Sequence, residues 1–192
     1  MSILKVICLN DELCNTHKSS MVLLNTHWKN VSKYANKLRE NNINIHKATI
    51  HKNNSILYIN DNSYGYISYE RKNMINDYLN SVNTDGITNS SFNIRLHPST
   101  IIKVYNTPSR NTTTLEFSCN DRIGLLADLC EMLSYFPYDI STAYINTHGN
   151  KALNIIMLEK DSKSLNNNDI QYITNVFEYE IKKTKYLKDE SY

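Results

Sequence analysis

Glycine, proline and cysteine are scarce in this sequence, and each scarcity excludes a class of protein. Four glycines and three prolines among 192 residues exclude collagen-like chains and Pro/Gly-rich disordered chains. The four cysteines form no CxxC pair and have no ligand-like spacing with the six histidines, which argues against a disulfide framework and a metal site. We therefore expect a protein of a reduced compartment whose fold rests on a hydrophobic core.

Charge of one sign and long apolar runs are also missing. A formal net charge of +2 is too small to indicate a nucleic-acid-binding protein, which would gather basic residues on one face. No apolar run approaches the roughly 18 residues of a membrane span. The first ten residues predict a strand rather than a secretory signal. The sequence therefore predicts neither membrane insertion nor secretion.

Signatures of catalysis are absent as well. The chain contains no P-loop, GxGxxG, HExxH or GxSxG motif, so it lacks the usual phosphate cradles, metal ligands and activated nucleophiles. Hydrophobic residues nevertheless make up 41% of the chain, which is enough for a real core. We therefore predict a protein that binds rather than catalyses and that needs no cofactor.

The second half of the chain shows the clearest pattern of secondary structure. Residues 112–119 are rich in β-branched and apolar side chains, which predicts a strand. Asn120 and Asp121 then offer a helix N-cap, and apolar residues from Leu126 to Leu133 recur at helical spacing. The remaining predicted elements are a strand at 139–147, its hairpin partner at 151–159 and a helix that begins at Asn167 and Asn168.

The first half repeats this order of elements more faintly. Residues 83–98 between the halves are polar and hold Gly86 and Pro98, which is typical of a linker. Matching element order on both sides of the linker favours an internal duplication. The predicted elements of the first half are strands at 19–26, 43–51 and 55–61, a helix marked by Val31–Leu38 and a helix marked by Met74–Val82.

One further strand precedes each half. The residues ILKV at 3–6 are echoed by IIKV at 101–104. If each half is a four-stranded antiparallel sheet with two helices on one face, these leading strands supply the missing fourth strands. In the crossed arrangement, which we favour, strand 3–9 completes the second sheet and strand 99–105 completes the first. In the alternative, each leading strand stays in its own half.

The segment LEFSCNDRIGLLADLCEML (115–133) resembles the first strand, loop and helix of ACT domains, whose loop typically reads D-R-x-G-L-L. The segment ISTAYINTHGNKALNIIMLEKD (140–161) resembles the second and third strands of ACT-domain-repeat (ACR) proteins and of uridylyltransferase C-termini. The two-module plan looks most like the small plastid members with two ACT modules and no catalytic domain. The resemblance implies an α+β fold of tandem ferredoxin-like βαββαβ modules, with a degenerate module at 1–98 and a second at 99–192.

In the family, the loop between the first strand and helix binds amino acids. N–H groups at a helix start are unsatisfied and attract a carboxylate. Gly124 leaves that backbone open, and we expect Gly124→Val to block a ligand while costing the fold only a few tenths of a kcal/mol. In the simpler alternative, Asp121 is the N-cap, Arg122 a surface charge and Gly124 a packing position. The ligand-binding residues implied by the resemblance are Asn120, Asp121, Arg122, Ile123, Gly124, Leu125 and Leu126.

The corresponding loop of the first module departs from this pattern. It reads Trp28-Lys29-Asn30-Val31, so both the acidic residue and the glycine are missing and an indole is present. A lone tryptophan more often packs than contacts a ligand. We therefore expect Trp28 in the core or at an interface, and no conventional site in the first module.

The resemblance also implies a function. It implies an amino-acid-responsive regulator of nitrogen assimilation, with glutamine as the foremost candidate ligand and glutamine synthetase or glutamate synthase as partner. A homodimer is expected, and the compartment would be the plastid, or otherwise the cytoplasm. The alternative is a protein-interaction module that keeps the ACT fold and has lost ligand binding.

Overall fold

Strands of both halves join into one sheet. The computed structural model describes residues 5–8, 20–83 and 96–189. The described strands form one eight-stranded sheet in the order β1-β2-β4-β3-β7-β8-β6-β5, and every neighbouring pair is antiparallel. The strands are β1 (Lys5–Cys8), β2 (Ser20–Leu24), β3 (Ile43–His51), β4 (Ser55–Asp61), β5 (Ile101–Thr107), β6 (Thr112–Asn120), β7 (Asp139–His148) and β8 (Lys151–Glu159).

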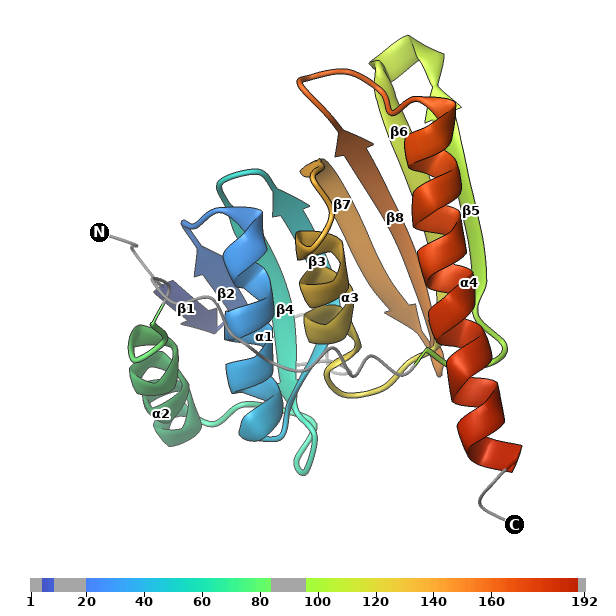
Figure 1. Cartoon of the computed structure of the whole chain (residues 1–192). Helices are drawn as coiled ribbons and strands as arrows, with labels where there is room; N and C mark the ends of the chain where they lie inside the picture. Colours follow the sequence, from blue (N-terminus) through green and yellow to red (C-terminus); the bar gives the residue numbers. More distant parts are fainter. Residues whose placement is uncertain (1–4, 9–19, 84–95, 190–192) are drawn as a thin grey trace.

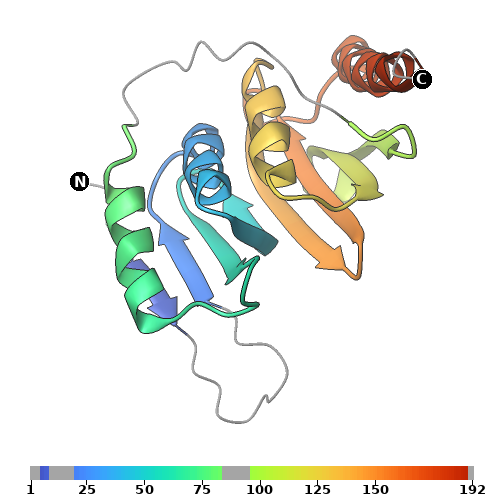
Figure 2. The ribbon, with the colours of Figure 1, turned by 90° about the horizontal axis from the view of Figure 1, so that it is seen from below.

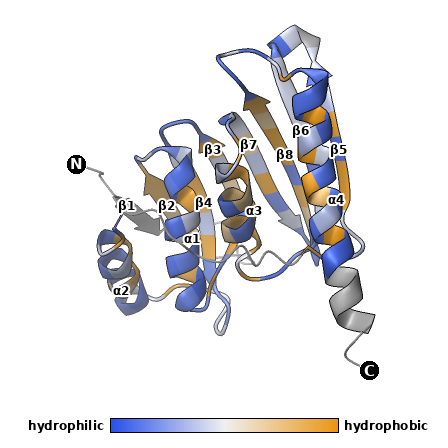
Figure 3. Ribbon diagram, viewed as in Figure 1, coloured by the Kyte–Doolittle hydropathy of each residue, from blue (hydrophilic) through white to orange (hydrophobic). Residues whose placement is uncertain are grey.

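Four α-helices accompany this sheet, which confirms the predicted α+β class. Figures 1 and 2 show α1 and α3 lying side by side over the middle of the sheet, while α2 lies near β1 and α4 runs beside β5. The visible sides of α1 and α2 are mostly hydrophilic (Figure 3). The helices are α1 (Val31–Glu40), α2 (Tyr69–Asn80), α3 (Leu125–Ser134) and α4 (Asn167–Asp189).

The two halves meet through both layers of the molecule. Strands β3 and β7 pair antiparallel from Lys47 opposite Asn146 to His51 opposite Thr142, and α1 packs on α3 directly above this junction. The sheet is therefore continuous across the boundary between the halves. The two halves therefore lie side by side.

The crossed arrangement of the leading strands is wrong. Strand β1 pairs with β2 of its own half, and β5 pairs with β6 along its whole length, from Ile101 opposite Ser118 to Thr107 opposite Thr112. A short 3₁₀ turn at Pro108–Arg110 follows β5, and Asn111, which has a positive φ of 51°, connects it to β6. Closing so short a hairpin costs little chain entropy, whereas a crossed strand would have to close a much longer loop.

The helix boundaries correct three details of the sequence analysis. Helix α3 begins at Leu125, so Asn120 and Asp121 do not cap it. Asn166 Oδ1, rather than Asn167 or Asn168, accepts the 2.9 Å hydrogen bond from the backbone of Asp169 at the start of α4. In α2 the buried side chains are Ile75 and Leu79, while Met74 is 43% exposed.

The core runs beneath the helices of both halves. Among its largest fully buried side chains are Trp28, Phe117 and Phe177, and the last two meet edge to face with ring centroids 5.9 Å apart. Most of the expected linker lies outside the described residues, but Leu96 near its end is 1% exposed. The chain between the halves is therefore anchored in the core before β5 begins.

Candidate functional site

The loop between β6 and α3 brings four of the seven predicted site residues, Arg122, Gly124, Leu125 and Leu126, to the junction of the two halves. Asn120 is exposed at the end of β6, and the Asp121 N–H donates to the carbonyl of Asn150 at 2.8 Å. Leu125 and Leu126 are buried beneath the loop. Gly124 itself takes the N-cap position of α3, in the left-handed region with a φ of 84° and with no side-chain cap.

The side of the loop that faces the first half is almost filled. A cavity of about 10 Å³ separates it from α1 and β3, which is room for one water molecule at most. The residues that line this cavity are Ala35, Ile43, Asn44, Ile45, Arg122, Gly124, Leu125, Leu126 and Ala127.

Arg39 of α1 covers Gly124. The Cδ atom of Arg39 occupies the space that a side chain on residue 124 would need. Arg39 Nη1 donates to Asp128 Oδ1 at 3.1 Å, while Arg122 Nη2 donates to the other oxygen of the same carboxylate. The Asp128 side chain is 12% exposed and that of Arg39 is 42% exposed. One nearly buried carboxylate thus holds two arginines, one from each half.

This geometry corrects the expected cost of Gly124→Val. The expectation of a few tenths of a kcal/mol treated residue 124 as an ordinary first residue of a helix. Its positive φ is strained for any residue with a Cβ, and a Cβ there collides with Arg39. The substitution therefore destabilises the fold as well as closing the loop.

Sequence reasoning missed Arg39 and Asp128. Asp128 did leave a signal, because it is an acidic residue within the apolar run LLADLCEML and buried carboxylates are rare unless they are paired. Arg39 gave no such signal in the sequence, since nothing in its own helix indicates that it reaches a loop 85 residues away.

The equivalent loop of the first half is filled by its own tryptophan. Trp28 is 0% exposed, which confirms the prediction that it packs. Its backbone N–H donates to the Lys52 carbonyl at 2.9 Å, and its indole Nε1 donates to Asp139 Oδ1 of the second half at 3.3 Å. The Trp28 side chain cannot leave this position without opening the core.

Charged groups surround Asp139 at the same place. Lys52 Nζ lies 2.7 Å from Asp139 Oδ2, and His27 Nε2 lies 3.8 Å from Oδ1. The hydrogen bond from Lys52 lowers the pKa of Asp139, helped by the Trp28 indole and opposed by partial burial. Burial lowers the pKa of His27, against the opposing effect of Asp139. These contacts tie the first loop to the start of β7.

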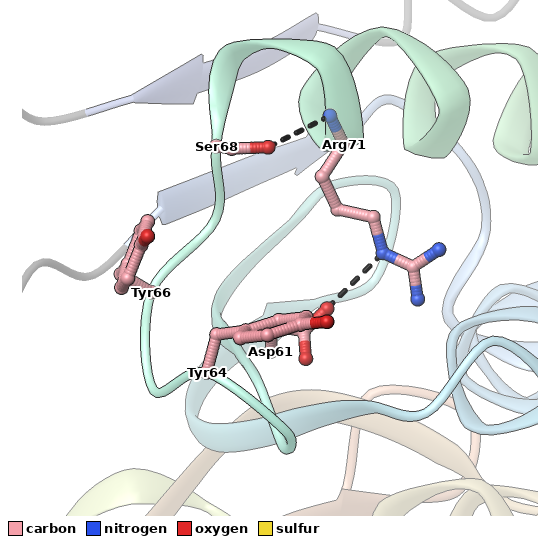
Figure 4. Close-up of a pocket in the computed structure, with 5 residues that line it drawn as sticks. All are labelled: Asp61, Tyr64, Tyr66, Ser68 and Arg71. Atoms are coloured by element: carbon pink, nitrogen blue, oxygen red, sulfur yellow. Dashed lines mark hydrogen bonds and ion pairs between the residues drawn. The ribbon is translucent and has the colours of Figure 1, made fainter.

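A second hollow of about 280 Å³ lies between β4 and α2 (Figure 4). At its base Arg71 Nε donates to the buried Asp61 at 3.1 Å, and Arg71 Nη2 donates to the carbonyl of Asn41 at 2.5 Å. Tyr64 and Tyr66 form its exposed walls. Since its ionic groups satisfy each other, we assign these contacts to holding the start of α2.

The other chemistry of the described residues is limited. Burial raises the pKa of Cys119 to about 11 and that of Cys130 to about 12, so both thiols stay protonated at neutral pH. Residues 5–8, 20–83 and 96–189 contain no group of three potential metal ligands. No helix within these ranges has the length and apolarity to cross a membrane.

Comparison with known proteins gives a distant structural similarity. No protein-family model matches the sequence. The aspartate kinase from Synechocystis is similar in structure with a TM-score of 0.44 and 11% sequence identity, over 74% of this chain and 24% of the kinase chain. The chain thus spans about a quarter of the length of that kinase. Membership of the ACR family stays a prediction.

Proposed function

We propose that this protein is a non-catalytic regulatory protein of the tandem ACT type, which binds a small amino acid at the loop between β6 and α3. The observation that carries the proposal is the placement of Arg39. A neighbouring side chain, rather than the loop itself, covers the backbone of Gly124. The loop can therefore open without any change in the sheet or in the core.

The charges at this loop match those of an amino acid. A zwitterion carries one ammonium and one carboxylate, the same pair of charges as Arg39 and Asp128. Its ammonium can take the place of Arg39 on Asp128, and its carboxylate can accept from the freed guanidinium and from N–H groups in the first turn of α3. Such an exchange leaves no charge unpaired.

Displacing Arg39 costs little free energy. Exposed ion pairs typically contribute about 0–1 kcal/mol; the Arg39 side chain is 42% exposed, whereas that of Asp128 is 12% exposed. Asp128 keeps Arg122 as a partner throughout. A ligand of modest affinity can therefore compete with Arg39, which suits a sensor of a metabolite present at high concentration.

The finer parts of the proposal rest on the resemblance of the DRIG loop. They are glutamine as the ligand, a setting in nitrogen assimilation, and glutamine synthetase or glutamate synthase as the regulated partner. A pull-down from native extract with and without glutamine tests the partner. A partner whose recovery does not change with glutamine would contradict amino-acid-dependent regulation.

A second candidate function has its own observation. The cavity at the loop measures about 10 Å³, and the equivalent loop is closed by Trp28. Both facts favour a protein-interaction module that has lost ligand binding.

Titration calorimetry against the twenty amino acids separates the two functions. We expect heat from one or two amino acids, loss of that heat in Asp128→Asn, and no change in Lys37→Ala. Lys37 is the matched control because it lies on the same helix as Arg39 and pairs with the exposed Glu40. Thermal unfolding of each variant confirms that it is folded. Absence of heat from all twenty amino acids favours the interaction module.

A further inference from the structure

The sheet face opposite the helices is unusually apolar in the second half. Solvent-facing sides of antiparallel sheets normally carry polar side chains. Here the cross-strand register places five large apolar or aromatic residues on that side, each between 43% and 62% exposed. They are Ile101, Tyr105, Tyr144, Leu153 and Ile155, and we call them, together with the groove between them, the outer face.

The outer face has a groove beside a ridge. The groove has a volume of about 430 Å³ and runs over β6, where Glu116 and Ser118 form part of its lining. On the neighbouring strand β8, Leu153 lies opposite Ser118 and Ile155 lies opposite Glu116. Leu153 is much larger than the Ser118 that it faces, so β8 stands above β6 at this pair.

We propose that the outer face binds a second copy of this chain, with the β8 ridge of each copy in the β6 groove of the other. A groove next to a ridge is self-complementary about a twofold axis that runs between them, parallel to the strands. This axis places Leu153 of one copy against Ser118 of the other, and the reciprocal contact forms at the same time. Such an arrangement is the isologous interface found in most homodimers.

The charges on the outer face permit this contact. Lys103 Nζ lies 3.9 Å from Glu116, and the Tyr105 hydroxyl donates to Glu116 at 2.7 Å. The ionic groups at the centre of the face thus compensate each other within one copy. Bringing two copies together adds no excess charge of either sign at the centre of the contact.

The area of the outer face predicts the strength of the dimer. Four strands spaced about 4.8 Å apart, each contributing about six residues, form a patch of roughly 20 by 20 Å. A contact of this size falls at the low end of specific interfaces, where complexes are weak. We therefore expect a dimer that dissociates on dilution through the micromolar range.

Sedimentation equilibrium over a range of concentrations tests the interface. We expect the native chain to shift from its monomer mass of 22.3 kDa toward twice that mass as the concentration rises. Leu153→Lys and, as a second variant, Ile155→Glu are expected to stay monomeric, because the same axis places Ile155 against Glu116 of the other copy. Tyr179→Lys, at an exposed position of α4 away from the outer face, is the control and should dimerise like the native chain.

A mixing experiment tests the predicted pairing of residues. Leu153→Lys and Ser118→Glu should each be monomeric alone, because each places a charge against an apolar or uncharged group. An equimolar mixture should recover a dimer, because the new lysine of one chain then meets the new glutamate of the other. A native chain that is monomeric at all concentrations, a dimeric Leu153→Lys, or a mixture that stays monomeric overturns the proposal.

Discussion

The two loops at the junction of the halves occupy equivalent places and are filled in different ways. In the first half, Trp28 fills the space from within its own loop and is 0% exposed. In the second half, Gly124 leaves the space empty and Arg39 enters it from the other half. A space filled by a core side chain is permanently closed, whereas one filled by a partly exposed cation can open.

The helices show the same contrast. Helices α1 and α3 have ten residues each, and Arg39 is the ninth residue of α1 as Leu133 is the ninth of α3. Leu133 is buried. The helix end near the tryptophan loop is therefore apolar and the end near the glycine loop is charged. Only the second loop combines an open backbone with a movable neighbour.

Among the substitutions that test this contrast, Trp28→Ala should have the largest effect on the free energy of unfolding. Removing a fully buried tryptophan typically costs about 3–5 kcal/mol because a cavity remains, and here it also removes the indole donor to Asp139. We expect a loss of this size in the free energy of unfolding measured by urea denaturation. Tyr69→Ala, at an exposed aromatic position of α2, should change it by less than about 0.5 kcal/mol. A loss below about 1 kcal/mol for Trp28→Ala would mean that the first loop is not permanently closed.

Glycine substitutions measure how tightly Arg39 covers the second loop. Gly124 and Gly149 both have positive φ, but only Gly124 has a neighbour where a Cβ would lie. Backbone strain alone should cost Gly149→Ala about 1–2 kcal/mol, and overpacking should add about 1–3 kcal/mol in Gly124→Ala. The added cost should shrink when Arg39→Ala is combined with Gly124→Ala. Equal costs at the two glycines would contradict the role of Arg39.

The pH dependence of Asp139 tests the electrostatic part of the first loop. Its pKa is lowered in the fold, chiefly by Lys52. A depressed pKa stabilises the fold above the ordinary carboxyl range, and this contribution is lost as the pH falls through the folded-state pKa. We therefore expect Asp139→Asn to lose less stability than the native chain between about pH 5 and pH 3. Denaturation curves at several pH values provide the measurement, and parallel profiles would argue against the Lys52–Asp139 contact.

The smallest expected effect belongs to Arg39→Ala. Asp128 keeps its bond to Arg122, so the free energy of unfolding should fall by no more than about 1 kcal/mol. Lys37→Ala on the same helix provides the baseline for losing an exposed ion pair. A loss well above 2 kcal/mol would show that Arg39 is a fixed part of the core, and the second loop would then be as closed as the first.

Local sequence patterns predicted most elements, because alternation and helical spacing are properties of neighbouring residues. Strands β3, β4 and β8 have the predicted boundaries. The sequence could not predict the contact of Arg39 with Gly124, because it depends on how two separate segments meet. The start of α3 was misplaced for a related reason. Asn120 and Asp121 have capping side chains, but the left-handed backbone of Gly124 delays the helix until Leu125.

The pairing of β3 with β7 has a consequence for how the chain is made. Roughly one hundred residues separate the two strands, and at the usual rates of synthesis the ribosome needs about 5–20 seconds to produce them. During that interval β3 is the open edge of a half-built sheet, and open edges invite pairing with other chains. Translation that stalls within the second half would prolong this exposure, so aggregation of nascent chains should be most severe for stalls just before residue 139.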